Sequence, residues 1–93
     1  MSSKIQHLSV QVPHKSAGNI IIQKPVAFDV FKVDGHFKAV PALSEEERRI
    51  ANLPEELVFY IEDDKPKSAR GHKDGNFHVI QDLVKRLREE KLL

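Results

Sequence analysis

The chain has 93 residues, of which 40% are hydrophobic and 31% are charged, and its formal net charge is +1. This length fits a single domain over residues 1–93, which buries about 60% of the surface that its unfolded chain exposes. Because cysteine is absent, disulfide bonds, thiolate catalysis and zinc sites with cysteine ligands are excluded.

The N-terminal segment alternates polar and apolar residues, as a strand with one buried face does. Residues 4–12 (KIQHLSVQV) fit such a strand. The segment lacks the unbroken apolar core of a signal peptide. No run in the chain has the roughly 20 apolar residues that a membrane-spanning helix needs. We therefore expect a cytoplasmic protein that has no membrane partner.

The next segment contains three consecutive isoleucines between a loop and a proline. Residues 13–18 (PHKSAG) are expected to form the loop, and the isoleucines at positions 20–22 are expected to form the apolar core of a short strand. Proline cannot donate a hydrogen bond to a sheet ladder, so Pro25 interrupts this strand. Residues 19–33 are therefore either one strand or two.

An Asp-Gly pair predicts the clearest hairpin of the chain. Asp34 and Gly35 are flanked by strand-like residues and tolerate the positive φ angles of a tight two-residue turn. A short helix is expected after Pro41, because Ser44 and Glu47 have the spacing of a capping box. The side chains expected on the buried side of this helix are Ile50, Ala51 and Leu53.

The last third of the chain predicts a strand, a turn, a second strand, a loop and a long helix. Residues 57–63 (LVFYIED) alternate like a strand, and DDKP is expected to form the turn. The polar segment KSARG is expected to lie at a sheet edge, where lysines discourage aggregation. Residues 76–91 have an apolar stripe at helical spacing. The stripe consists of Phe77, Ile80, Leu83, Val84 and Leu87.

Together these segments predict an α+β fold. We expect a mainly antiparallel sheet of about 5 strands, a short middle helix, and a long C-terminal amphipathic helix packed on one face.

Positive charge gathers on the edge hairpin and in the loop before the last helix. Glycines in this loop let backbone N–H groups turn toward an anion, and the helix N-terminus favours negative charge. The segment matches neither the phosphate loop of nucleotide hydrolases nor a dinucleotide fingerprint. The alternative is a structural connection in which Asp74 or Asn76 caps the helix. The predicted anion- or partner-binding residues are Lys65, Lys67, Arg70, His72, Lys73 and Asn76.

The leading functional hypothesis is a small non-catalytic binding module that contacts a protein partner and uses no cofactor or metal. The sequence lacks a catalytic motif, a cofactor fingerprint and the ligand spacing of a metal site. An edge strand could accept a partner strand or form a homodimer. One alternative is nucleic-acid binding, with phosphates contacted by Lys67, Arg70 and Lys73. A second alternative is a small enzyme that uses His72 and Asp74, with His78 nearby.

Overall fold

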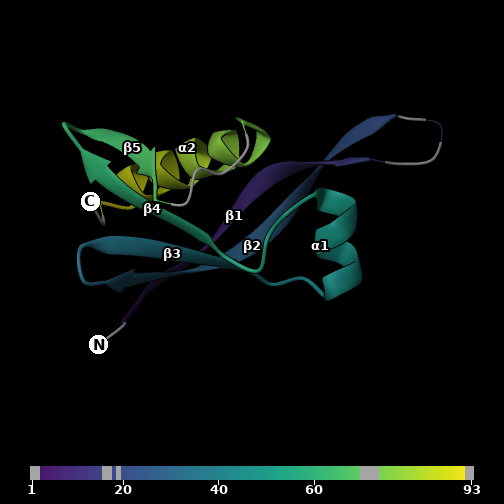
Figure 1. Ribbon diagram of the computed structural model, residues 1–93. Helices are drawn as coiled ribbons and strands as arrows, with labels where there is room; N and C mark the ends of the chain where they lie inside the picture. The colour runs from purple at the N-terminus through teal and green to yellow at the C-terminus, as the bar shows by residue number, and fades with distance from the viewer. Residues whose placement is uncertain (1–2, 16–17, 19, 70–73, 92–93) are drawn as a thin grey trace.

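Five strands and two helices build the molecule. The computed structural model describes residues 3–15, 18, 20–69 and 74–91. The elements are β1 (Ser3–Lys15), β2 (Ile21–Val33), β3 (His36–Pro41), α1 (Glu45–Ala51), β4 (Leu57–Glu62), β5 (Lys65–Ser68) and α2 (Asp74–Glu89). The strands form one antiparallel sheet in chain order, and this sheet curls (Figure 1). The predicted antiparallel sheet of five strands, short middle helix and long C-terminal helix are confirmed.

β1 and β2 extend beyond the rest of the sheet. They pair along their length, from Ser3 opposite Lys32 to Lys15 opposite Ile21. β3 pairs only with the second half of β2, beginning at Phe28. Residues 9–15 and 21–27 therefore leave the sheet as a two-stranded ribbon, which we call the arm (Figure 1). The arm contributes to the elongated dimensions of the molecule, 41 × 24 × 24 Å.

Two prolines lie inside the strands of the arm. Pro13 is opposite Gln23, and Pro25 is opposite Gln11. Each strand has a single sheet neighbour here, so the missing N–H of proline can lie on the free edge without breaking the ladder. The prediction of a loop was therefore wrong for residues 13–15. The open choice between one strand and two is decided for Ile21–Val33, which form one strand that passes through Pro25.

Two hairpin turns use consecutive residues with positive φ. Asp34 and Gly35 have φ values of 44° and 84°, and Asp63 and Asp64 have values of 53° and 64°. The favoured two-residue hairpin turn requires two successive residues with positive φ. The predicted Asp-Gly turn is confirmed, and the second turn falls within the predicted DDKP segment.

α1 begins at the predicted capping box. The Ser44 side chain accepts a hydrogen bond from the Glu47 N–H at 3.2 Å, and the Glu47 carboxylate accepts one from the Ser44 N–H at 3.0 Å. The bond from the Ser44 backbone, followed by that from its side chain, lowers the pKa of Glu47. The helix ends at Asn52, which has a φ of 55°. Left-handed residues commonly end helices in this way.

α2 packs against the inner face of the curled sheet. It contacts β4 and both edge strands, β1 and β5. A single hydrophobic core joins the helix to the sheet. The buried members on α2 are Val79, Ile80, Leu83, Val84 and Leu87, and those on the sheet are Leu8, Val10, Val12, Val26, Phe28, Val30, Phe37, Ala39, Leu57 and Phe59. Neither described helix is long and apolar enough to cross a membrane.

An arginine near the end of α2 also holds the turn between β4 and β5. The Arg88 guanidinium donates to the Asp64 backbone oxygen at 2.5 Å and to its carboxylate at 3.0 Å. Both side chains are exposed, so this pair contributes little stability compared with the core beneath it. The contact positions the hairpin relative to the helix.

Shortening a buried residue of α2 tests the role of the helix in holding the sheet. Leu87→Ala is expected to lower the free energy of unfolding by about 2–5 kcal/mol, because Leu87 is fully buried. Urea denaturation followed by circular dichroism measures the loss. Lys85→Ala, on the exposed side of α2, is the control and should change stability by less than about 0.5 kcal/mol. Equal losses of stability for Leu87→Ala and Lys85→Ala would show that the packing of α2 does not stabilise the sheet.

The capping box makes a pH-dependent prediction. Because the folded state lowers the pKa of Glu47, ionised Glu47 stabilises the fold above the ordinary glutamate pKa. This stabilisation is lost as the pH falls through the lowered pKa. Ser44→Ala is expected to raise the pKa of Glu47, measured by NMR titration, and to reduce stability at neutral pH by about 1 kcal/mol. Ser9→Ala, at an exposed position of β1, should change neither quantity.

Candidate functional site

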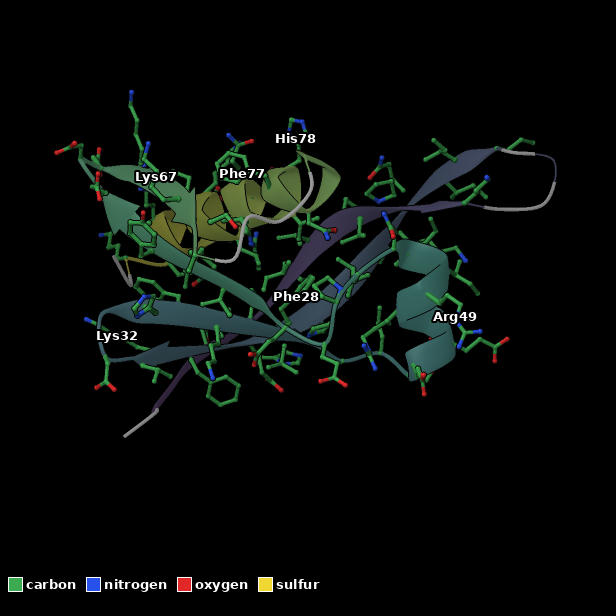
Figure 2. The ribbon with its side chains drawn as sticks, viewed as in Figure 1. Phe28, Lys32, Arg49, Lys67, Phe77 and His78 are labelled. Atoms are coloured by element: carbon green, nitrogen blue, oxygen red, sulfur yellow. The ribbon has the colours of Figure 1, made fainter. Side chains whose placement is uncertain are left out.

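The structure describes three of the six predicted binding residues. Lys65 and Lys67 are exposed on β5, and Lys67 extends into solvent (Figure 2). Asn76 is half-buried in the first turns of α2. The other three predicted residues, Arg70, His72 and Lys73, lie outside the described residues. Whether the six residues form one surface therefore stays a prediction.

Asn76 lines a groove of about 440 Å³ where the arm joins the sheet. Three elements that are distant in the sequence meet there: the arm, the end of α1 and the start of α2. The lining residues are Val12, Pro13, Lys15, Ile21, Ile50, Ala51, Asn52, Asn76 and Val79. Most of these side chains are apolar, and the two asparagines add amide groups that can donate and accept hydrogen bonds. We call this site the arm groove.

Four isoleucines on α1 and at the free end of the arm face solvent, and two of them, Ile21 and Ile50, line the arm groove. The exposed fractions of Ile20, Ile21 and Ile22 are 62%, 66% and 43%, and that of Ile50 is 48%. The sequence placed Ile50 on the buried side of α1, and this was wrong. The isoleucines of β2 lie where β2 pairs with β1 alone, and both Ile21 and Ile50 line the groove. Clustered apolar side chains on the surface of a small domain commonly mark an interaction site.

Among the described residues that line the arm groove, Lys15 is the charged one. Residues 1–28, which include the whole arm, contain no Asp or Glu. Lys15 lines the groove, and Lys24, which is opposite the lining residue Val12, is exposed. α1 has its glutamates in the first turn and its arginines in the last turn, and the groove touches only the end of this helix. An acidic ligand would therefore meet favourable charges at the groove.

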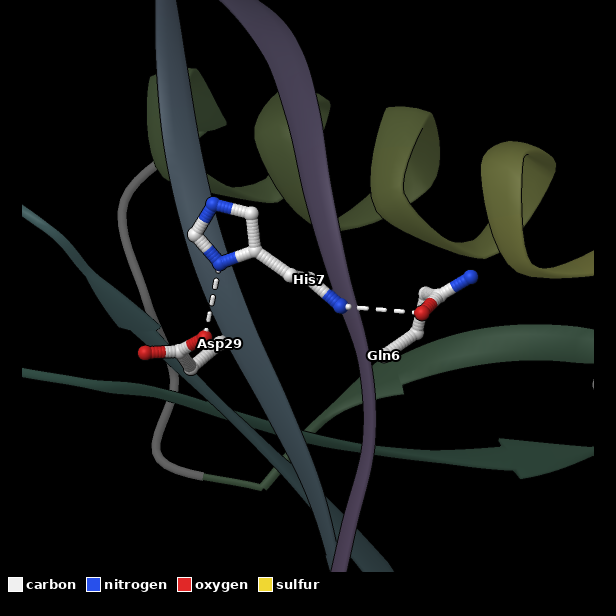
Figure 3. Close-up of polar contacts among 3 residues, drawn as sticks. All are labelled: Gln6, His7 and Asp29. Carbon is white, nitrogen blue, oxygen red and sulfur yellow. Dashed lines mark hydrogen bonds and ion pairs between the residues drawn. The ribbon is translucent and has the colours of Figure 1, made fainter.

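The sheet surface opposite α2, which we call the outer face, is a second candidate surface. Figure 3 shows part of it, with His7 and Asp29 on the near side of β1 and β2 and α2 behind the strands. His7 Nδ1 lies 2.8 Å from the Asp29 carboxylate. Farther along the outer face, aromatic residues alternate with basic ones across neighbouring strands. Lys67, one of the predicted binding residues, lies on this face opposite Tyr60.

The predicted enzymatic residues are described only in part. His78 is exposed on α2 and points away from the sheet (Figure 2). His72 and the side chain of Asp74 lie outside the described residues. Within the described part of the chain, no three His, Asp or Glu side chains gather as a metal site would require. The enzyme hypothesis stays a prediction of the sequence.

The arm groove was missed because its residues come from three separate segments. One local signal was available: three consecutive isoleucines must place apolar side chains on both sides of a strand, and the nearby Pro25 restricts pairing with a further strand. No family model, characterised protein or solved structure matches the chain, so no relative indicates a role for these residues.

Proposed function

We propose that the chain is a small non-catalytic binding module that holds an apolar, acidic segment of a protein partner in the arm groove. The observation behind this proposal is that Ile21 and Ile50, which line the groove, are exposed to solvent. Covering apolar surface is favourable by about 25 cal/mol per Å². A partner that packs on these side chains therefore gains free energy from a surface that the isolated chain leaves in water.

The dimensions of the arm groove favour a short segment of the partner. Its volume of about 440 Å³ is suited to a few side chains. The neighbouring arm supplies a backbone edge as well, because residues 21–26 of β2 pair only with β1. An extended segment could hydrogen-bond to this edge while its apolar side chains occupy the groove. Pro25 limits that pairing, since it has no N–H to donate.

The expected acidic character of the partner follows from the charges of the arm. Lys15 lines the groove and Lys24 is exposed nearby. Carboxylates beside the apolar side chains of the partner would meet these ammonium groups and would accelerate association. Asn76 can hydrogen-bond to the backbone of the bound segment.

This proposal keeps the class of function predicted from the sequence but moves the working surface. The sequence placed that surface at the basic edge hairpin and the following loop. Asn76 is the described member of the predicted set that lines the arm groove. Lys65 and Lys67 instead lie on β5.

A peptide titration tests the proposal. The probes are short synthetic peptides that combine leucine or isoleucine with glutamate, and a matched set with lysine in place of glutamate. The acidic set is expected to shift backbone NMR signals of Val12, Ile21 and Val79. Ile21→Thr should weaken this binding about tenfold or more, because it removes most of an apolar contact while keeping a β-branched side chain. Val40→Thr, at another exposed apolar position, is the control and should leave the affinity unchanged.

Three results would contradict the proposal. The first is equal binding of the acidic and basic peptides, and the second is an affinity that Ile21→Thr does not alter. The third is a stable dimer that Ile21→Thr dissociates in analytical ultracentrifugation, because a second copy of the chain would then occupy the arm.

A further inference from the structure

The outer face of the sheet has an arrangement of side chains that the proposed protein contact does not use. Phe31 on β2 lies directly opposite Lys38 on β3. Tyr60 on β4 lies directly opposite Lys67 on β5. This face thus has two pairs in which an aromatic ring on one strand lies opposite an ammonium group on the next strand.

A histidine joins the two pairs into one surface. The rings of His36 and Tyr60 meet edge to face, with their centroids 6.1 Å apart. A hollow of about 410 Å³ lies beside them, and it includes His36, Lys38 and Val58 among its lining residues. Phe31 and Tyr60 are half-buried and His36 is exposed, so the rings remain accessible to a ligand. The helix does not close this surface, because α2 packs on the opposite face of the sheet.

Two ammonium groups of this region, those of Lys38 and Lys67, can contact an anion, and Asp34 is the acidic residue among those that line the hollow. In the part of the chain that the structure describes, Lys67 makes no ion pair, and its neighbour across the strands is the Tyr60 ring. Lys38 lies 3.9 Å from the Glu56 carboxylate, and both groups are partly exposed. An exposed pair at this distance contributes little free energy, so Lys38 can exchange it for a phosphate.

We infer that the outer face binds single-stranded nucleic acid, with bases stacked on Phe31, His36 and Tyr60 and phosphates held by Lys38 and Lys67. Stacking platforms flanked by cations are the means by which proteins bind single strands without sequence preference. Adjacent strands are about 4.8 Å apart, a separation that a nucleotide can span between its base and its phosphate. This inference does not rest on the proposed protein contact, because the two surfaces use different residues.

A single strand suits this surface better than a duplex. Bases in a duplex are stacked on one another, whereas unpaired bases can turn outward to contact protein rings. An acidic peptide could satisfy Lys38 and Lys67 but would leave the three rings unused. The combination of rings and cations therefore favours an oligonucleotide over a peptide.

Tyrosine fluorescence provides a direct test. Tyr60 is the only tyrosine, and the chain has no tryptophan. Stacking of a base on its ring should quench the intrinsic fluorescence of the protein when oligo-dT or oligo-U is added at low salt. With two phosphate contacts, log K should fall with log salt with a slope of about −1.4. Quenching by either the DNA or the RNA probe supports the inference.

Variants separate stacking from charge, with anisotropy of a labelled oligo-dT as the measure of affinity. Tyr60→Leu should weaken binding about tenfold or more, whereas Tyr60→Phe, which keeps the ring, should bind like the parent chain. Lys67→Gln should reduce the salt slope by about 0.7. Lys85→Gln, which removes an exposed charge from α2, and Ile21→Thr in the arm are the controls and should change neither quantity.

Several outcomes would overturn the inference. These are no binding of either oligonucleotide at low salt, equal binding of a duplex of the same length, or equal quenching by a poly-glutamate peptide. Equal losses for Lys85→Gln and Lys67→Gln would also overturn it, because the affinity would then reflect net charge alone. Binding that Tyr60→Leu and Tyr60→Phe weaken equally would show that the ring does not stack.

Discussion

The packing of α2 against both edge strands is the interaction on which the rest of this structure depends. A chain-order sheet of five strands has β1 and β5 at opposite edges, and they reach the same helix only because the sheet curls. The apolar stripe of α2 fills the inside of that curl, where Ile80, Leu83 and Leu87 are fully buried. The hydrophobic gain is shared by strands at both ends of the sheet. Losing the helix would expose the inner face and remove the reason for the curvature.

This arrangement also explains why the arm is exposed. α2 and the shorter strands cover only part of the long β1–β2 pair, so residues 9–15 and 21–27 continue without a third strand. An isolated two-stranded ribbon is marginally stable in water. Here one end is anchored in the core by Val12 and Val26, which are almost fully buried. The free end presents isoleucines that add nothing to the core, which is consistent with a role in contacts to another molecule.

The two proposed surfaces lie at two different places on the curled sheet. At the end of the sheet, the arm, α1 and α2 converge on a groove with apolar walls. On the convex side, strand alternation turns every second side chain outward, and these include Phe31, Tyr60 and Lys67. Apolar surface suits a protein segment, and rings beside ammonium groups suit a nucleic acid. The chain is thus proposed to hold two different ligands on separate surfaces.

Local patterns in the sequence determined the elements of this fold. The Asp34-Gly35 turn, the Ser44–Glu47 cap and the stripe of α2 depend on residues a few positions apart, and each lies where the sequence predicted it. Local sequence patterns could not show whether the isoleucines are buried or exposed. A β-branched run favours a strand whether or not its side chains are buried, and burial depends on which elements pack against that part of the strand. Only the tertiary structure decided that the end of the arm is exposed. It also decided that Lys67 lies beside Tyr60 and that Asn76 lines a groove. The physical reason is that each of these outcomes depends on segments that are distant in the sequence and meet only in the folded chain.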